Sequence, residues 1–204
     1  MLRLDHLAVS ARTLAEGVAA VEFALGVPLV PGGQHPLMST HNRLLGLGDI
    51  YLEVIAPDPD APDPGRPRWF DLDRFEGRPR LTNWICACDD LAAALAVAPR
   101  GSGMITDLER GDLRWRMAIP ADGRLPFDGA YPALIQWLGN QHPTRRLPEV
   151  EVRLERLEIA HPQAAALREA LKGQFDDPRV AVIDGPDMDM RAHFTTPHGP
   201  RVLE

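Results

Sequence analysis

The stretch LTNWICACDDLAAALAVAPRG, from Leu81 to Gly101, predicts a strand, a helix and a closing glycine in that order. An apolar strand-forming run comes first, a capping aspartate follows, and an alanine-rich segment then carries the helix. The same order occurs near the start of the chain, where the strand-like segment Leu2–Ser10 precedes the helical segment LAEGVAAVEFALG. There Thr13 and Glu16 form a capping box, and Gly26 ends the helix. The sequence therefore looks internally duplicated.

Further strands complete both copies of the pattern. HNRLLGLG and IYLEVIAP follow the first helix, with room for another short strand before them, and LRWRMAIP and ALIQWLG follow the second helix. When the two copies are aligned so that Asn83 matches His6, their helical segments also match. When Gln136 is aligned with Glu53, the last strands of the two copies match as well.

We expect an α+β fold in which two paired βαβββ modules form one cupped mixed sheet. A weaker third repeat, RLERLEIAHPQAAALREALKG, predicts a C-terminal β-α-β-type unit. The expected segments of this one compact fold are a first module at 1–57, a proline-rich linker at 58–79, a second module at 80–145 and the C-terminal unit at 146–204. The alternative is that an α+β chain contains several such units by chance.

Composition excludes several classes of partner. The chain has 22 basic and 29 acidic residues and a net charge of −7, and no basic cluster could neutralise a row of phosphates. Nucleic acid is therefore not an expected partner. No segment approaches the roughly 20 apolar residues of a membrane span, and the first residues lack the apolar region of a secretion signal. We expect a cytoplasmic protein that binds a small molecule, with its oligomeric state left open.

The two cysteines, Cys86 and Cys88, are expected to be buried and reduced. In a strand, side chains two residues apart point to the same face and run parallel, which does not favour a disulfide. A zinc site is not expected from them either, because no second cysteine pair exists.

Glu53 stands in the middle of the apolar strand YLEVI, where an unpaired carboxylate is costly to bury. A polar cavity would explain it, because the cup would bring His6 and Glu53 together with two substrate-binding candidates of the second module, Asn83 and Gln136. His6, Glu53 and Gln136 are candidate ligands of a divalent metal ion such as zinc, manganese, nickel or iron. A lone histidine on a strand is also common as a structural residue, and this interpretation of His6 stays open.

Other segments offer groups that could line the same cavity. His35, Thr40 and Asn42 lie in or beside the loop GGQHPLMSTHN and are candidate substrate-binding residues. Trp69 and Phe70 follow the proline-rich linker and are candidates for a lid over the cup.

Four nearby residues are expected to have structural roles. Trp84 and Trp137 each adjoin a predicted cup residue, so strand alternation places them on the opposite face, against the helices. His142 in NQHP is interpreted as a turn residue, and His161 in AHPQ as the start of a helix.

The order of these motifs resembles the glyoxalase-like domain family of the vicinal oxygen chelate superfamily. The resemblance spans nearly the whole chain and is most specific in the Gly-Gly-x-His loop, the YLE strand and the LIQW…HP segment. It implies paired βαβββ modules forming a cup that commonly holds a divalent metal, which chelates two adjacent oxygens of a substrate or intermediate. The matching motifs are LDHLAV, GGQHPLMSTHN, YLEVIAPDPD, a proline-rich RWF, LRWRM and LPFDGAYPALIQWLGNQHP.

Residue by residue, the resemblance places the metal-binding positions of the first module on His6 and Glu53. The corresponding positions of the second module fall on Asn83 and Gln136. Metal-binding members usually have histidine or another strong ligand at the position of Asn83, so the resemblance implies an incomplete ligand set and weak metal binding.

Two functions are compatible with these residues. In the first, a metal-dependent lyase or isomerase, an ion held by His6 and Glu53 polarises two adjacent oxygens, and Glu53 or a neighbour moves a proton on the carbon between them. In the second, a metal-free protein sequesters a small, partly apolar compound in the same cup. The fold alone does not choose between them, because one fold hosts several chemistries.

Overall fold

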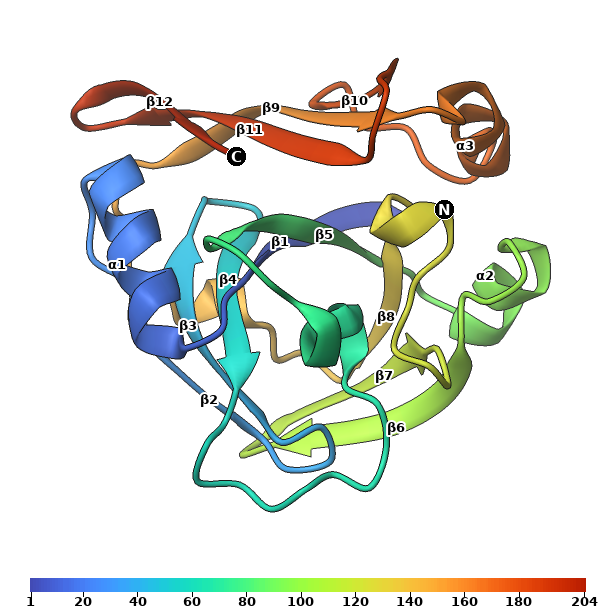
Figure 1. Cartoon of the computed structure of the whole chain (residues 1–204), viewed down its shortest axis with the longest axis horizontal. Helices are drawn as coiled ribbons and strands as arrows, with labels where there is room; N and C mark the ends of the chain where they lie inside the picture. The colour runs from blue at the N-terminus through green and yellow to red at the C-terminus, as the bar shows by residue number, and fades with distance from the viewer.

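The structure of the protein is a computed structural model that describes all 204 residues, and it contains two β-sheets and three α-helices, arranged as in Figure 1. No helix is long and apolar enough to cross a membrane. The first part of the chain forms β1 (Arg3–Ser10), α1 (Leu14–Leu25), β2 (Val30–His35), β3 (Thr40–Gly46), β4 (Tyr51–Pro57) and the 3-10 segment η1 (Trp69–Arg74). The second part forms β5 (Arg80–Ala87), α2 (Leu91–Val97), β6 (Met104–Arg110), β7 (Leu113–Ile119), η2 (Phe127–Gly129), β8 (Ala133–Leu138) and η3 (Pro143–Arg145). The last part forms β9 (Arg153–His161), α3 (Ala164–Leu171), β10 (Val180–Asp184), β11 (Asp189–Thr196) and β12 (Gly199–Leu203).

The first eight strands form one curled sheet in the order β2-β3-β4-β1-β5-β8-β7-β6. β1 and β5 pair antiparallel at its centre, and each also pairs in parallel with the last strand of its own half, β4 or β8. Each half runs β-α-β-β-β, and the strand order is mirrored across the β1–β5 pair. The expected α+β fold of paired βαβββ modules is confirmed, and the strands encircle η1 (Figure 1).

Local signals set the helix ends. The Thr13 side chain caps α1 by accepting a hydrogen bond from a first-turn N–H group, and Gly26 ends the helix with a left-handed φ of 74°. The second helix is shorter than the sequence pattern suggested and ends at Val97. Ala98 precedes Pro99 and is therefore extended rather than helical.

The C-terminal unit forms a second sheet in the order β10-β9-β11-β12, which lies over the outer face of the curled sheet (Figure 1). β9 and β10 pair in parallel, with α3 between them in the chain, so the expected β-α-β-type unit is confirmed. Trp84 of the curled sheet and Leu157 and Phe194 of the second sheet belong to one continuous apolar core. Cys86 lies in the same core, and both cysteines are free and buried as expected.

A second, smaller core fills the concave side of the curled sheet. It contains Trp69, Phe70 and Leu72 of η1, packed among apolar residues of β5, β7 and β8. This arrangement places η1 across the opening of the cup. It also leaves only a small polar region inside the cup, around β1 and β4.

Candidate functional site

His6 and Glu53 face each other inside the curled sheet. In the parallel β1–β4 pair, His6 lies opposite Tyr51 and Ala8 lies opposite Glu53, so these four side chains share one face of the sheet. His6 Nε2 lies 3.7 Å from Glu53 Oε2, and both side chains are buried. The hydrogen bonds of both side chains go to their other polar atoms, Nδ1 and Oε1. Two polar atoms are thus left facing one another in the interior.

Asn42 on β3 holds the far side of Glu53. Its Nδ2 donates to Glu53 Oε1, while its Oδ1 accepts a hydrogen bond of 2.7 Å from the N–H of Gly33. A Cβ atom on Gly32 would lie 2.0 Å from Asn42 Oδ1, so only glycine fits there. The Gly-Gly turn therefore makes room for the side chain that orients Glu53.

Asp5 orients His6 from the other side. Asp5 lies at a break in the β1–β5 register, and its Oδ1 is 2.6 Å from His6 Nδ1. Burial by itself would raise the pKa of Asp5, but hydrogen bonds from His142 and His6 hold this pKa well below its usual range. An ionised carboxylate can only accept, so His6 Nδ1 carries a hydrogen and donates it to Asp5, and Nε2 is the ring nitrogen that faces Glu53.

Arg110 connects the two edges of the curled sheet next to this pair. It extends from β6 and donates to His35 Nε2 at 3.1 Å and to Asn42 Oδ1 at 3.3 Å. Arginine has no acceptor, so His35 accepts at Nε2 and donates from Nδ1 to Thr40 Oγ1, 3.1 Å away. Burial, reinforced by the charge of Arg110, lowers the pKa of His35 to about 3. His35 is therefore a neutral, fixed part of the wall.

These groups line a partly open cavity of about 30 Å³, which has room for a water molecule or an ion but not for a substrate. Trp69 and Phe70 roof it, and the Tyr51 ring stacks on the His6 imidazole at 4.3 Å. Phe70 and Asp71 have left-handed φ values of 58° and 55°, a conformation that non-glycine residues seldom adopt. The remaining wall is apolar and comes from Trp115, Met117, Ile135 and Trp137.

A family model described as a glyoxalase-like domain matches residues 4–175, which is most of the chain. The chain belongs to the glyoxalase-like domain family. The fold is that of the vicinal oxygen chelate superfamily, as the sequence motifs indicated. No curated protein matches the chain by sequence.

Solved structures with a similar fold are distant in sequence. A hypothetical protein from Staphylococcus aureus has 14% identity, covering 93% of this chain and 88% of that chain, with a TM-score of 0.63. Methylmalonyl-CoA epimerase from Mycobacterium tuberculosis has 17% identity, covering 68% and 88%, with a TM-score of 0.42. A variant of the Streptomyces coelicolor epimerase in complex with 2-nitronate-propionyl-CoA has 14% identity, covering 69% and 96%, with a TM-score of 0.42. At 14% identity the likeness to the Staphylococcus aureus protein shows the fold alone.

In this glyoxalase-like domain, Gln136 does not lie in the cup. Its Oε1 accepts from the N–H of Leu91 at 3.2 Å and its Nε2 donates to the carbonyl of Asp89 at 2.9 Å, both beside the start of α2. The neighbouring residues of β8, Ile135 and Trp137, face the cavity instead. The alignment of Gln136 with Glu53 was therefore wrong by one residue. The expectation that Trp137 packs against the helices was wrong for the same reason. Trp84 lies in the outer core, as expected.

Asn83 is also separated from His6 and Glu53. Ile85, not Asn83, lies opposite His6 in the β1–β5 pair, and Asn83 lies opposite Ala8. Asn83 lines a second cavity, and Phe70 forms a wall of both. The second module thus presents isoleucines, Ile85 and Ile135, near the polar pair of the first module.

Asp5, Arg110 and His142 join the site although no sequence pattern assigned them to it. His142 lies in a turn, as expected, where it caps η3, and its Nε2 also approaches Asp5 Oδ2 at 3.1 Å. His161 comes just before α3, where its Nδ1 accepts the N–H of Gln163. An acidic residue directly before the strand histidine was the one available signal for Asp5.

The residues fit a divalent ion as a two-ligand site. His6 Nε2 and Glu53 Oε2 converge, and each ligand is held from behind, His6 by Asp5 and Glu53 by Asn42, which is how metal ligands are usually oriented. No group of three or more histidine, cysteine, aspartate or glutamate side chains is arranged to hold a metal. The structure therefore offers a partial ligand set, without the Gln136 ligand that the sequence suggested.

Proposed function

We propose that the protein is an enzyme of the lyase or isomerase class that moves a proton at a carbon next to two adjacent oxygens of a small molecule. The observation that supports this best is the pair of atoms without a hydrogen-bond partner, His6 Nε2 and Glu53 Oε2, which lie 3.7 Å apart in a small cavity. Burying such a pair costs stability, so a functional role is the simplest reason for it.

Glu53 is the residue to which we attribute proton transfer. Asn42 occupies Oε1, so Oε2 is the oxygen left to take a proton from a substrate carbon. His6, with its tautomer set by Asp5, offers Nε2 as a second acceptor beside it. Arg110 lines the same cavity and places a positive charge where negative charge develops on a substrate oxygen.

His6 and Glu53 would also hold a divalent metal ion as the candidate cofactor. When bound, such an ion polarises substrate oxygens as a Lewis acid. With only two protein ligands, we expect binding to the protein alone to be weak and to strengthen when a substrate adds its oxygens.

Deuterium exchange tests this function without knowledge of the natural substrate. The protein is incubated in D₂O, with and without Zn²⁺, Mn²⁺, Ni²⁺ or Fe²⁺, with a panel of 2-hydroxy acids, 2-oxo acids, hydroxyketones and 2-oxoaldehyde thiohemiacetals. We expect NMR to show deuterium entering the carbon next to the paired oxygens for at least one of them. Glu53→Gln should slow this exchange by about 100-fold or more.

The matched control is Glu155→Gln, a surface carboxylate outside the cavity, which should exchange at the parent rate. Binding of a compound without exchange under any condition would contradict the enzyme and favour the alternative, a metal-free binding protein. No exchange and no binding would contradict both.

A further inference from the structure

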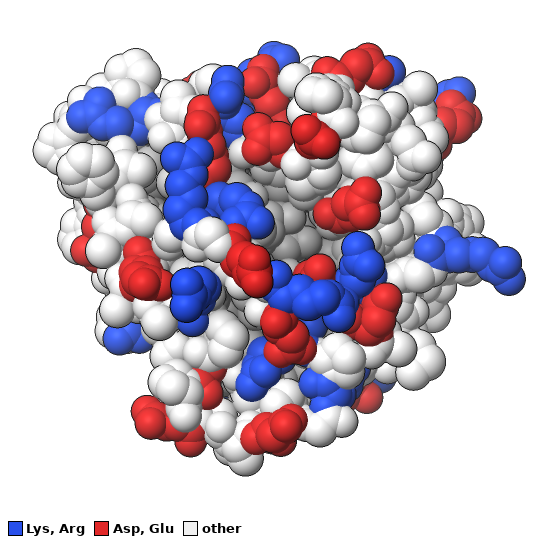
Figure 2. Space-filling view, viewed as in Figure 1, with Lys and Arg blue, Asp and Glu red and all other residues white.

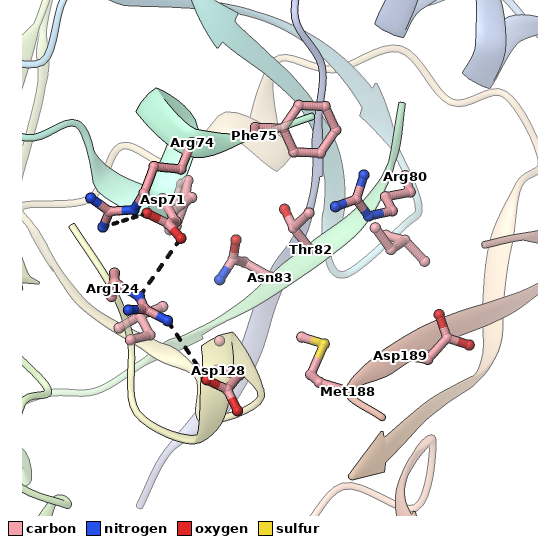
Figure 3. Close-up of a pocket in the computed structure, with 14 residues that line it drawn as sticks. Asp71, Arg74, Phe75, Arg80, Thr82, Asn83, Arg124, Asp128, Met188 and Asp189 are labelled. Atoms are coloured by element: carbon pink, nitrogen blue, oxygen red, sulfur yellow. Dashed lines mark ion pairs between the residues drawn. The ribbon is translucent and has the colours of Figure 1, made fainter. Parts of the chain in front are cut away.

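A second cavity, of about 260 Å³, lies next to the His6–Glu53 cavity and plays no part in the proposed reaction. Its walls come from η1, the start of β5, the turn before β8, and Met188 and Asp189 at the start of β11 (Figure 3). All three parts of the chain thus contribute to it. On the face shown in Figure 2, basic and acidic side chains surround a central hollow.

Asn83 is the feature of this cavity that most needs a ligand. The residue is 3% exposed, and its Oδ1 is buried with no hydrogen-bond partner. Figure 3 shows its amide in the middle of the cavity, away from the charged residues of the rim. An unsatisfied buried acceptor costs about 1–3 kcal/mol, and a ligand that donates a hydrogen bond would recover this.

Positively and negatively charged side chains around the cavity are equal in number, but two of them, Arg80 and Asp189, form no ion pair. Arg74 and Arg124 both pair with Asp71, and Arg124 also approaches Asp128. Arg80 instead lies over the Phe75 ring at 4.5 Å and donates to backbone carbonyls.

Asp189 is the second charge without an ion pair, and Figure 3 shows it on the same side of the cavity as Arg80, with Met188 beside it. A lining with one free cation and one free anion suits a ligand that carries both charges. A ligand with a single strong charge would leave one of the two uncompensated.

Part of the wall is apolar. Phe70, Leu81, Leu125 and Met188 line the cavity between the polar groups. Its volume lies just below the usual range for drug-sized ligands, which begins at about 300 Å³. The space therefore suits a small metabolite with an apolar part.

We propose that this cavity binds a small zwitterion of the amino-acid class with an apolar side chain. The carboxylate pairs with Arg80, and the ammonium group donates to Asn83 Oδ1 on the side facing Asp189. The apolar side chain packs against Phe70 and Leu125. The site does not depend on the reaction proposed for the His6–Glu53 cavity.

Trp69 provides a signal for occupancy. Its ring stacks on Phe70 with 5.6 Å between centroids, and Phe70 is a wall of both cavities. A ligand against Phe70 therefore changes the surroundings of Trp69. Trp69→Phe identifies the part of a fluorescence change that comes from this residue rather than from the other tryptophans.

The experiment titrates the full chain with each of the twenty common amino acids by calorimetry and by tryptophan fluorescence. We expect at least one apolar amino acid to bind. The analogue without its amine and the analogue without its carboxylate should each bind about 10-fold more weakly or worse, as expected for the loss of a charge-assisted hydrogen bond. Asn83→Leu and Arg80→Gln should weaken binding of the amino acid by a similar factor, while the surface control Arg156→Gln should not.

Two results would overturn the proposal: no binding by any amino acid, or binding that neither Asn83→Leu nor Arg80→Gln weakens. Asn83→Leu should melt at or above the parent temperature, because it removes an unsatisfied buried amide. If that variant does not fold, Arg80→Gln at the rim of the cavity decides the question alone. Because neither change touches His6 or Glu53, failure here leaves the proposed function standing.

Discussion

Asp5 shows how much of the site depends on a single side chain to which the sequence motifs assign no role. It receives hydrogen bonds from His6, from Trp137 Nε1 at 2.9 Å and from His142 Nε2 at 3.1 Å, and so connects three separate segments. Its position at a break in strand register lets a residue next to His6 reach the His6 ring. Strand alternation alone would send the two side chains to opposite faces.

His6 and Glu53 could be predicted from the sequence because a polar residue inside an apolar strand demands a partner. Arg110 could not be predicted, because it lies on an edge strand rich in charged residues and its role appears only when β6 approaches β2. Asn42 and Thr40 were expected to contact a substrate, and the structure shows them holding Glu53 and His35.

The first prediction concerns His35 and pH. Its folded pKa of about 3 lies below the unfolded value of about 6.5. As pH falls below about 6.5, the unfolded chain takes up a proton that the folded chain does not, so stability is lost as pH falls toward 3. Between pH 7 and pH 5 we expect His35 to reduce the free energy of unfolding by about 2 kcal/mol.

Urea denaturation of the parent and of His35→Gln at both pH values measures this effect. Glutamine can still accept a hydrogen bond from Arg110 but does not titrate. The variant should lose clearly less stability than the parent between the two pH values. Equal losses would show that His35 is protonated in the folded state.

At the scale of elements, β8 is where sequence reasoning was wrong. The segment ALIQWL has large apolar residues on both faces, so alternation does not reveal which face meets the cup. In the structure Leu134 lies in the outer core and Ile135 in the inner one, which puts Gln136 on the outer side. The sequence predicted that a strand forms here. It could not predict which face of the strand points into the cup, because both faces are buried.

The second prediction follows from the orientation of β8, which places Gln136 on the outer side of the sheet. Gln136→Ala removes two hydrogen bonds beside the start of α2 and should reduce stability by about 1 kcal/mol. It should leave metal-dependent stabilisation unchanged, because the side chain points away from the cavity. Thermal melts with and without metal measure both effects, and a loss of the metal effect in Gln136→Ala would contradict the phase of β8.

The linker element η1 combines a predicted and an unpredicted feature. Its aromatic pair lies over the cup, where the sequence placed a lid, but the lid motion itself stays a prediction. The left-handed backbone at Phe70 and Asp71 could not be predicted, since Phe70 is a residue type that rarely adopts it and a single aspartate is only a weak signal for it. The small volume of the cavity beneath, about 30 Å³, gives a physical reason to expect movement, because a substrate does not fit beside Phe70 as it stands.

At the scale of the whole molecule, the duplication was visible because each module repeats its own local signals. The strand order of the second sheet was not visible, because β10 pairs with β9 rather than following the order of the two modules. Pairings between distant segments leave little local trace in a single sequence.

The third prediction is that the molecule unfolds in one step. The outer core contains residues of both sheets, so removing the C-terminal sheet would expose the core of the curled sheet. All four tryptophans lie before residue 138, whereas far-ultraviolet circular dichroism reports on the whole chain. Urea transitions followed by the two signals should coincide, and an earlier transition in circular dichroism alone would show that the C-terminal unit unfolds separately.

The most direct test of the site is the effect of metal ions on the melting temperature of the parent and of Glu53→Gln. An ion that binds only the folded state raises the melting temperature with its concentration. We expect Zn²⁺, Mn²⁺, Ni²⁺ or Fe²⁺ to raise the melting temperature of the parent protein. Glu53→Gln keeps the shape of the side chain but removes its charge, and it should weaken metal binding by about 10-fold or more. Equal shifts in the two proteins, or no shift in either with any of these ions, would contradict the assignment of His6 and Glu53 as a metal-binding pair.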